Sequence, residues 1–201
     1  MKTSHKKKNT EMDFQKIEWK PGTLLSPVPV VLVSCGGSAN TKPNIITIAW
    51  AGTICSDPPM LSISVRPERY SFDIINREKE FVVNMPGTNQ AGITDWCGVK
   101  SGRNVDKFSA MKLTAAPCSK VKAPMILECP VSLECIVKNK ISLGSHVMFL
   151  AEIVAVQVRA SLVDKRGKLH LEKAGLISYS HGSYFHLGVK KGSFGFSVRK
   201  K

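Results

Sequence analysis

The amino-acid sequence predicts a mainly β protein that forms a closed or partly closed barrel with a few peripheral helices. Short apolar segments, either alternating or rich in β-branched residues, recur along the chain, and turns containing glycine or proline separate them. Few stretches have helical spacing. Many short strands of this kind pair into barrels, whereas a parallel α/β sheet needs a helix after each strand.

Four strands are expected in the first half, at residues 30–34, 44–54, 60–65 and 81–84. Gly36-Gly37 forms a turn that joins the first two strands as a hairpin, and Asp57-Pro58-Pro59 ends the second. In the third strand Leu61, Ile63 and Val65 share one side, which is expected to face the core.

Helices are expected at three places between and after these strands. Ser71 is a suitable N-cap for a helix over 72–80, because its hydroxyl can accept a hydrogen bond from the first turn. Phe72 and Ile75 would then share the side that packs on the core. A second helix over 89–97, a glycine-containing loop at 100–104 and a helical turn at 106–111 are expected to follow.

The second half is expected to be mostly strand. The run 147–158 is rich in β-branched residues, which favour extended backbone. A strand at 131–137, a hairpin at 161–171 around Asp164-Lys165-Arg166-Gly167, and loop with a short strand over 179–195 complete the chain.

The chain carries 29 Lys and Arg against 15 Asp and Glu, a net charge of +14. Three explanations are open: a solvated lysine-rich surface, attraction of small anionic ligands such as nucleotides, or binding of nucleic acid. The lysines are scattered and no basic stripe alternates with aromatic residues. A nucleic-acid partner is therefore not expected.

The 201 residues suit a single domain over 14–201, preceded by a basic arm at 1–13 that is expected to be disordered. No apolar run approaches the roughly 20 residues of a membrane helix, and the basic N-terminal segment lacks the apolar core of a signal peptide. A cytoplasmic protein without membrane contact is expected. The six cysteines contain no C-x-x-C pair, so free thiols are expected.

The segment 43–71 contains the candidate binding site. One side of its first strand carries small residues and the other side bulky ones, including Trp50 and Ile54, which are expected to face the core. Arg66 and Arg69 flank the turn before the helix, and paired guanidinium groups near a helix N-terminus can hold a phosphate. The pattern predicts a site for a flat anionic ligand; two surface arginines and an ordinary cap are the alternative.

No motif for catalysis by side chains is present. The sequence lacks a nucleotide-binding glycine fingerprint, a G-x-S-x-G elbow and an H-E-x-x-H pair, and its five histidines are widely spread. No catalytic residue and no metal site are therefore assigned.

Taken in order, several segments resemble the flavin reductase-like family of FMN-binding split barrels, and within it the flavoredoxin-like proteins. The matching segments are PVPVVLVSC at 27–35, NIITIAWAGTICSDPPMLSISVRPERYS at 44–71, FVVNMP at 81–86, DKF at 106–108, ECPVSLEC at 128–135, GSHVMFLAEI at 144–153 and YFHLG at 184–188. The resemblance implies a Greek-key split β-barrel that binds FMN non-covalently as one domain over 14–201, and a homodimer.

The resemblance also implies which residues hold the cofactor. The strand and turn that would line the flavin ring contribute Thr47, Ala49, Trp50, Ala51, Thr53, Ile54, Cys55 and Ser56. The residues that would hold the phosphate are Arg66, Arg69, Tyr70, Ser71, Lys100 and Ser101. His146 matches a histidine common in the family, and Tyr184 belongs to an aromatic pair that could close over the ring.

The implied function is that of an NAD(P)H-dependent flavin reductase-like oxidoreductase. Hydride would pass from NADH or NADPH to the flavin and electrons onward to a small-molecule or protein acceptor, without need of a general base. One alternative is an FMN electron-transfer protein that does not oxidise NAD(P)H directly. A second is a basic barrel that binds nucleic acid or another anion and catalyses nothing.

Overall fold

The structure is a computed structural model that describes residues 14–199, and the expected arm at 1–13 lies outside the described residues. The strands are β1 (Val28–Pro29), β2 (Val31–Cys35), β3 (Asn44–Ile48), β4 (Ala51–Ser56), β5 (Pro59–Val65), β6 (Glu80–Met85), β7 (Ala115–Ala116), β8 (Met125–Ile126), β9 (Val131–Ser142), β10 (Val147–Val158), β11 (Ile177–Ser180) and β12 (Ser183–His186). The α-helices are α1 (Tyr70–Glu78), α2 (Ala91–Val99) and α3 (Lys107–Ala110). Short 3₁₀ turns are η2 (Thr88–Gln90), η3 (Ala160–Leu162), η4 (Leu171–Lys173) and η5 (Phe196–Val198).

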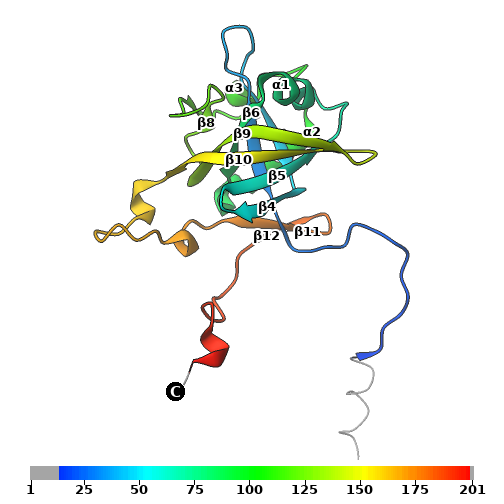
Figure 1. The fold of residues 1–201 in the computed structure, drawn as a ribbon, viewed down its shortest axis with the longest axis vertical. Coiled ribbons are helices and arrows are strands. Elements are labelled where there is room, and N and C mark those ends of the chain that lie inside the picture. Colours follow the sequence, from blue (N-terminus) through cyan, green and yellow to red (C-terminus); the bar gives the residue numbers. More distant parts are fainter. Residues whose placement is uncertain (1–13, 200–201) are drawn as a thin grey trace, which may run out of the picture.

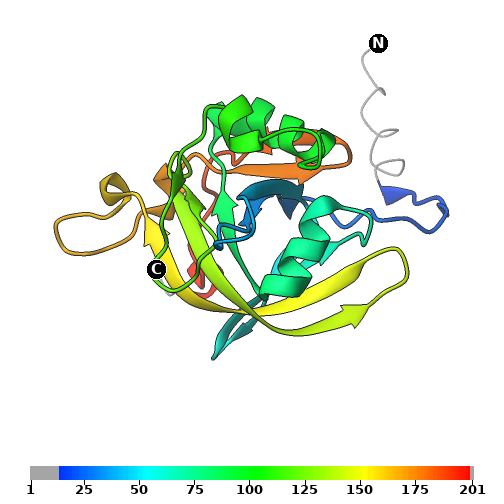
Figure 2. The same cartoon turned by 90° about the horizontal axis from the view of Figure 1, so that it is seen from above.

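Seven antiparallel strands form one sheet in the order β3-β2-β6-β9-β10-β5-β4 (Figure 1). The edge strands β3 and β4 are consecutive in the chain, so the sheet has to curl until its two edges meet; Figure 2 shows this curl from above. Neighbours that are distant in sequence, β2 with β6 and β5 with β10, give Greek-key connections. The predicted mainly β split barrel is confirmed.

The strand expected over 44–54 is in fact two strands. Ala49 and Trp50 form a bend between β3 and β4, and the Ser64 amide donates to the Trp50 carbonyl at 2.9 Å. The bend carries the chain from one sheet edge to the other, so the side-chain alternation expected along the whole segment is lost. Trp50 is 37% exposed and Ile54 45%, and the prediction that they face the core is wrong.

The long hairpin of β9 and β10 lies in the middle of the strand order of the sheet. β10 has the predicted bounds, whereas β9 continues five residues beyond the predicted end at 137 because it stays paired with β10 as far as Ser142. Register shifts between Leu150 and Ala151 and between Ile153 and Ala155 interrupt this ladder. Such bulges increase local twist and bending, which helps a sheet to curl.

The main core lies inside the curl and is closed by α1. Ile63, Ile75, Phe81 and Phe149 are all 0% exposed, and the ring of Phe72 packs on Phe149 at 5.6 Å between centroids. The predicted helical side formed by Phe72 and Ile75 is confirmed. Since each buried aliphatic or aromatic side chain contributes about 1.5–3 kcal/mol, this cluster holds α1 to the sheet.

The other side of β2 and β3 is covered by α2 and α3. Leu32 and Ile45 pack there with Cys97 and Phe108, and all four are at most 7% exposed. A strand that is covered on both sides has an almost continuous apolar sequence, as residues 30–33 do. This second layer brings the end of α2 and the start of α3 against β3.

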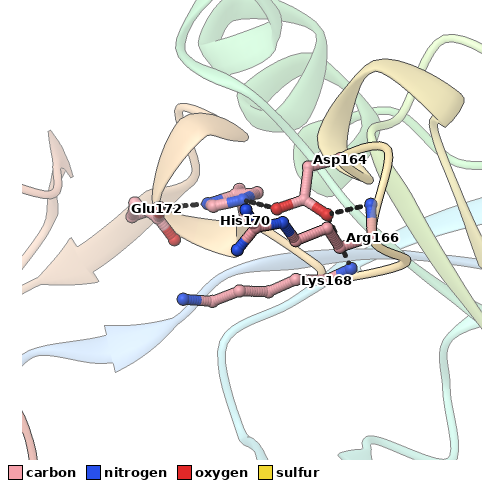
Figure 3. Close-up of polar contacts among 5 residues, drawn as sticks. All are labelled: Asp164, Arg166, Lys168, His170 and Glu172. Atoms are coloured by element: carbon pink, nitrogen blue, oxygen red, sulfur yellow. Dashed lines mark hydrogen bonds and ion pairs between the residues drawn. The ribbon is translucent and has the colours of Figure 1, made fainter.

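The expected hairpin at 161–171 is present as a tight turn whose two arms are linked by backbone hydrogen bonds, but the arms are too short to count as strands. Val163 and Leu169 form one isolated bridge, and the turns η3 and η4 flank it. The Asp164 carboxylate accepts from the backbone N–H groups of Arg166 and Lys168 at 2.9 and 3.0 Å (Figure 3). Side-chain to backbone bonds of this kind stabilise turns and compete with strand pairing.

His170 ties this loop together between two carboxylates. Its Nε2 lies 2.9 Å from Asp164 Oδ2 and its Nδ1 3.0 Å from Glu172 Oε1 (Figure 3). Both nitrogens can donate only when the ring is protonated. The hydrogen bond to Asp164, followed by that to Glu172, raises the pKa of His170 above its usual 6.5.

The raised pKa of His170 predicts a pH-dependent loop. Because the protonated ring is favoured in the folded state, its stabilisation is complete below pH 6.5 and is lost as the pH rises through the folded pKa. Asp164→Asn should lower the pKa of His170, as measured by proton NMR titration. A wild-type His170 that titrates at or below 6.5 would contradict the prediction.

All six cysteines are free thiols, as predicted. Within residues 14–199, no helix has the length and apolar character needed to cross a membrane. The cytoplasmic location and the single-domain organisation stay predictions.

Candidate functional site

A pocket of about 360 Å³ opens where β3, the start of α1, the end of α2 and the loop 100–104 meet. Its wall includes Arg66, Arg69, Tyr70, Ser71, Lys100 and Ser101, six residues that the sequence analysis assigned to a phosphate. The six residues come from two segments of the chain, 66–71 and 100–101, which the fold brings together. We call this hollow the cationic pocket.

A second hollow of about 190 Å³ adjoins the cationic pocket and runs along β3 to the bend at Trp50. The two share Ile46, Arg66 and Arg69. Thr47, Ala49 and Trp50 line this second hollow, together with His146 from the β9–β10 connection. We call it the ring pocket, because the small side chains of Thr47 and Ala49 and the aromatic side chain of Trp50 on its wall suit a planar group.

Positive charge is concentrated in the cationic pocket. Arg66, Arg69, Lys100 and Lys107 line it, against one carboxylate, that of Glu68. Arg66 pairs loosely with Glu68 at 3.6 Å, and Arg69 makes a long hydrogen bond, 3.4 Å, to the Gly98 carbonyl. Both guanidinium groups therefore keep donors for an anion.

The pocket wall rests on a buried contact that changes the predicted role of Ser71. Ser71 is 2% exposed and lies inside α1, whose N-cap is Arg69, so the predicted N-cap is wrong. The Asn44 side-chain amide donates to the Ser71 hydroxyl at 2.7 Å, which joins β3 to α1. Gly102 packs so closely on Asn44 and Tyr70 that an added methyl group would overlap both.

The loop 100–104 is held against α1 by Arg103. Its guanidinium donates to the Glu68 carbonyl at 3.0 Å, lies 3.7 Å from the Asp73 carboxylate, and sits over the Tyr70 ring at 5.6 Å. Cation–π contacts of this kind contribute about 0.5–1 kcal/mol at exposed positions. Arg103 thus keeps Lys100 and Ser101 at the pocket.

His146 presents a neutral ring to the ring pocket. Burial, reinforced by the Arg66 charge, lowers the pKa of His146 below its usual 6.5. Its Nδ1 lies 2.9 Å from the Ser145 hydroxyl. At neutral pH it is therefore a hydrogen-bonding group without charge.

The structure separates some predicted ring residues from the two pockets. Thr53, Ile54, Cys55 and Ser56 lie on the edge strand β4 and line neither pocket. Ala51 lies beside Trp50 in a neighbouring apolar hollow. Contact of these five residues with a flavin stays a prediction.

Tyr184 does not line the ring pocket, whereas Tyr179, against which it packs, does. The Tyr184 hydroxyl donates to the Asp95 carboxylate at 3.1 Å; burial, and then this bond, raises the pKa of Tyr184 to about 12. Its ring packs edge-on against Tyr179 at 5.6 Å, and Tyr179 lines the pocket. Sequence reasoning missed Tyr179, although it stands directly opposite Tyr184 in the β11–β12 register.

Sequence reasoning also missed Lys107, which lines the cationic pocket although it is only 3% exposed. The sequence analysis includes the DKF segment in the family resemblance, but nothing in the sequence shows that its lysine is buried.

The thiol of Cys97 lies on the same wall of the cationic pocket. Burial raises the pKa of Cys97 to about 11, so the thiol is protonated at neutral pH and is a poor nucleophile.

The two pockets can bind and orient a ligand, but they contain no pair of nucleophile and base. Among residues 14–199, no group of three His, Cys, Asp or Glu side chains is placed to hold a metal ion. The arrangement suits a ligand with a planar part and an anionic part.

Comparisons with known proteins agree with this geometry. The family model described as "Flavin reductase like domain" matches residues 23–187. The flavoredoxin of Desulfovibrio vulgaris (Miyazaki F) superposes with a TM-score of 0.85 at 28% identity, over 92% of this chain and 100% of that chain. The flavoredoxin of Methanosarcina acetivorans has a TM-score of 0.81 at 27% identity, with the same coverage of 92% and 100%.

A curated relative of Archaeoglobus fulgidus, an uncharacterized protein, is 33% identical over 115 residues, which are 57% of this chain and 65% of that protein. The match to the family model extends over most of the chain and includes β2 to β12 and both pockets. The chain belongs to the flavin reductase-like family.

Proposed function

We propose that this protein binds FMN non-covalently, with the phosphate in the cationic pocket and the flavin ring in the ring pocket. The observation that supports this most is that the two pockets adjoin and differ in character. Both contain Arg66 and Arg69, but the cationic pocket adds Lys100 and Lys107, whereas the rest of the ring pocket is small, aliphatic and aromatic side chains with His146. FMN has a dianionic phosphate at one end and a planar ring at the other.

The donors present suit a phosphate group. Arg66 and Arg69 offer guanidinium groups that can bind phosphate oxygens in pairs, Lys100 adds a flexible ammonium, and Ser101 a hydroxyl. At the other end, neutral His146 can donate to or accept from the ring edge, and Trp50 and Tyr179 give aromatic walls. These residues bind and orient, while the bound flavin would supply the redox chemistry.

The proposed activity is that of an NAD(P)H-dependent flavin reductase-like oxidoreductase, as the family description suggests. No general base is needed for hydride transfer, which agrees with the lack of a nucleophile–base pair in the pockets. The second candidate is an electron-transfer flavoprotein that receives electrons from a partner. The likeness to two flavoredoxins favours this candidate.

Spectroscopy of the purified, FMN-reconstituted protein tests both candidates. We expect flavin absorption bands that shift on binding and remain after desalting. Anaerobic addition of NADH or NADPH should bleach them within seconds in a reductase, whereas a carrier would be bleached only by dithionite or a reduced partner protein. A protein that stays colourless after incubation with FMN would contradict both candidates.

We also propose a homodimer. The terminal segments extend from the barrel (Figure 1) and expose large apolar side chains, with Trp19 67%, Leu25 86% and Phe196 59% exposed. Large apolar side chains exposed on extended segments of this kind suit contact with another surface, and a second copy is the simplest partner. Light scattering coupled to size-exclusion chromatography should give twice the mass of 22.0 kDa. A monomer at all concentrations would disprove the dimer.

A further inference from the structure

Lys107 is a buried cation, 3% exposed, that forms no ion pair with any residue in the described part of the chain. Its Nζ donates to the carbonyls of Ile45 at 2.8 Å and Cys97 at 2.7 Å. A lysine ammonium has three N–H donors, so one remains. None of the six ion pairs found among residues 14–199 includes Lys107.

This arrangement is unfavourable in the absence of an anion. Carbonyl oxygens satisfy hydrogen bonds but carry no full charge, and a buried charge is costly unless it is paired. Burial lowers the pKa of Lys107 below its usual 10.5, and the nearby Arg69 charge acts in the same direction.

The position of Lys107 shows where a counter-ion would lie. The ammonium bridges β3 and the end of α2, and Lys107 is one of the residues that line the cationic pocket. Arg66, on the rim of the same pocket, has 52% of its side chain exposed, so solvent screens its charge much more.

We propose that Lys107 is the inner counter-charge for the ligand's phosphate and that it makes the site selective for phosphorylated over unphosphorylated flavin. This inference rests on the proposed FMN site and assigns to it a residue and a selectivity. The remaining N–H of Lys107 donates to a phosphate oxygen, and the phosphate in turn supplies the negative charge that the fold lacks. Riboflavin, which has the same ring and sugar chain, cannot do this.

The test compares FMN and riboflavin affinities, by fluorescence quenching at fixed ionic strength, in the wild type and in Lys107→Met. FMN should bind about 10- to 100-fold more weakly to the variant, the amount expected for one charge-assisted hydrogen bond. Riboflavin should change by less than about threefold, because its binding does not use the ammonium. An FMN to riboflavin ratio equal to that of the wild type would overturn the proposal.

The matched control is Lys112→Met, which removes the same charge from an exposed position five residues further along, outside the pocket. It should leave the ratio unchanged. Lys107→Gln serves as a second variant if Lys107→Met does not fold, because its neutral amide can still donate to the two carbonyls.

Thermal unfolding gives a readout that does not depend on flavin. Inorganic phosphate should raise the Tm of the wild type more than chloride at equal ionic strength, and this difference should be smaller in the Lys107 variants, in which Arg66, Arg69 and Lys100 still line the pocket. A protein that shows this difference but binds no FMN would contradict the proposed function and leave the anion site standing. Equal effects of phosphate and chloride on the wild type would overturn the role of Lys107.

Discussion

Replacing Arg66 and Arg69 together by alanine should weaken FMN binding roughly 100-fold. Each charge-assisted hydrogen bond to a phosphate contributes about 1.5–3 kcal/mol, and the lower value applies because Arg66 is half exposed, with 52% of its side chain accessible. Two such losses amount to about 3 kcal/mol, or two orders of magnitude in Kd. Isothermal titration of the double variant with FMN measures the change.

A control for net charge is the double variant Lys165→Ala/Arg166→Ala. Both residues are exposed at the tip of the 160–173 loop and line neither pocket, so the same two positive charges are removed elsewhere. FMN affinity should then change by less than about threefold, the effect of screened long-range charge. If Arg66→Ala/Arg69→Ala folds and binds FMN as the wild type does, the two arginines are ordinary surface residues.

Asn84→Leu should lower the free energy of unfolding by about 3–5 kcal/mol, the range for breaking a buried hydrogen-bond network. The Asn84 side chain is 0% exposed and has four principal partners. It donates to the Leu32 carbonyl at 3.0 Å and the Ser34 hydroxyl at 2.9 Å, and accepts from the Ile126 amide and the Ser132 hydroxyl, both at 2.8 Å. Leucine has nearly the same size but leaves these groups unpaired.

Thermal unfolding followed by circular dichroism should show a loss of about 10 °C for Asn84→Leu, since 1 kcal/mol corresponds to about 2–4 °C in a chain of this size. Asn139→Leu makes the same chemical change at an exposed position of β9, where the side chain accepts only from the next amide. It should stay within about 0.5 kcal/mol of the wild type. Equal losses in the two variants would show that the network around Asn84 adds nothing specific.

Much of the fold could be predicted because its signals are local. The β-branched run at 147–158 is one strand with the predicted bounds, and the alternation at 60–65 places Leu61, Ile63 and Val65 in the core. The break in 44–54 could not be predicted in this way. Its residues continue the alternation without a proline or a turn motif, and the bend is imposed by the curled sheet, which needs its two edges to meet there.

Some residues of the candidate site could likewise be predicted from the sequence, and others could not. The pairing of Arg66 and Arg69 before a helix is a sequence pattern, and the structure places both on the wall of the cationic pocket. The sequence analysis assigned Tyr184 and missed Tyr179, which lines the ring pocket, because the pairing of these two residues on neighbouring strands is visible only once the register is known. Contact of Tyr184 with the cofactor stays a prediction.

What the sequence by itself determined is the family, the mainly β architecture and the segment that carries the arginines, because each depends on short local segments and on their order along the chain. Only the tertiary structure decided that Ser71 is a buried partner of Asn44 and that Lys107 lies beneath the pocket. Burial and charge pairing depend on packing between segments far apart in sequence, such as β3, α2 and α3. No local pattern of residue types encodes those distances.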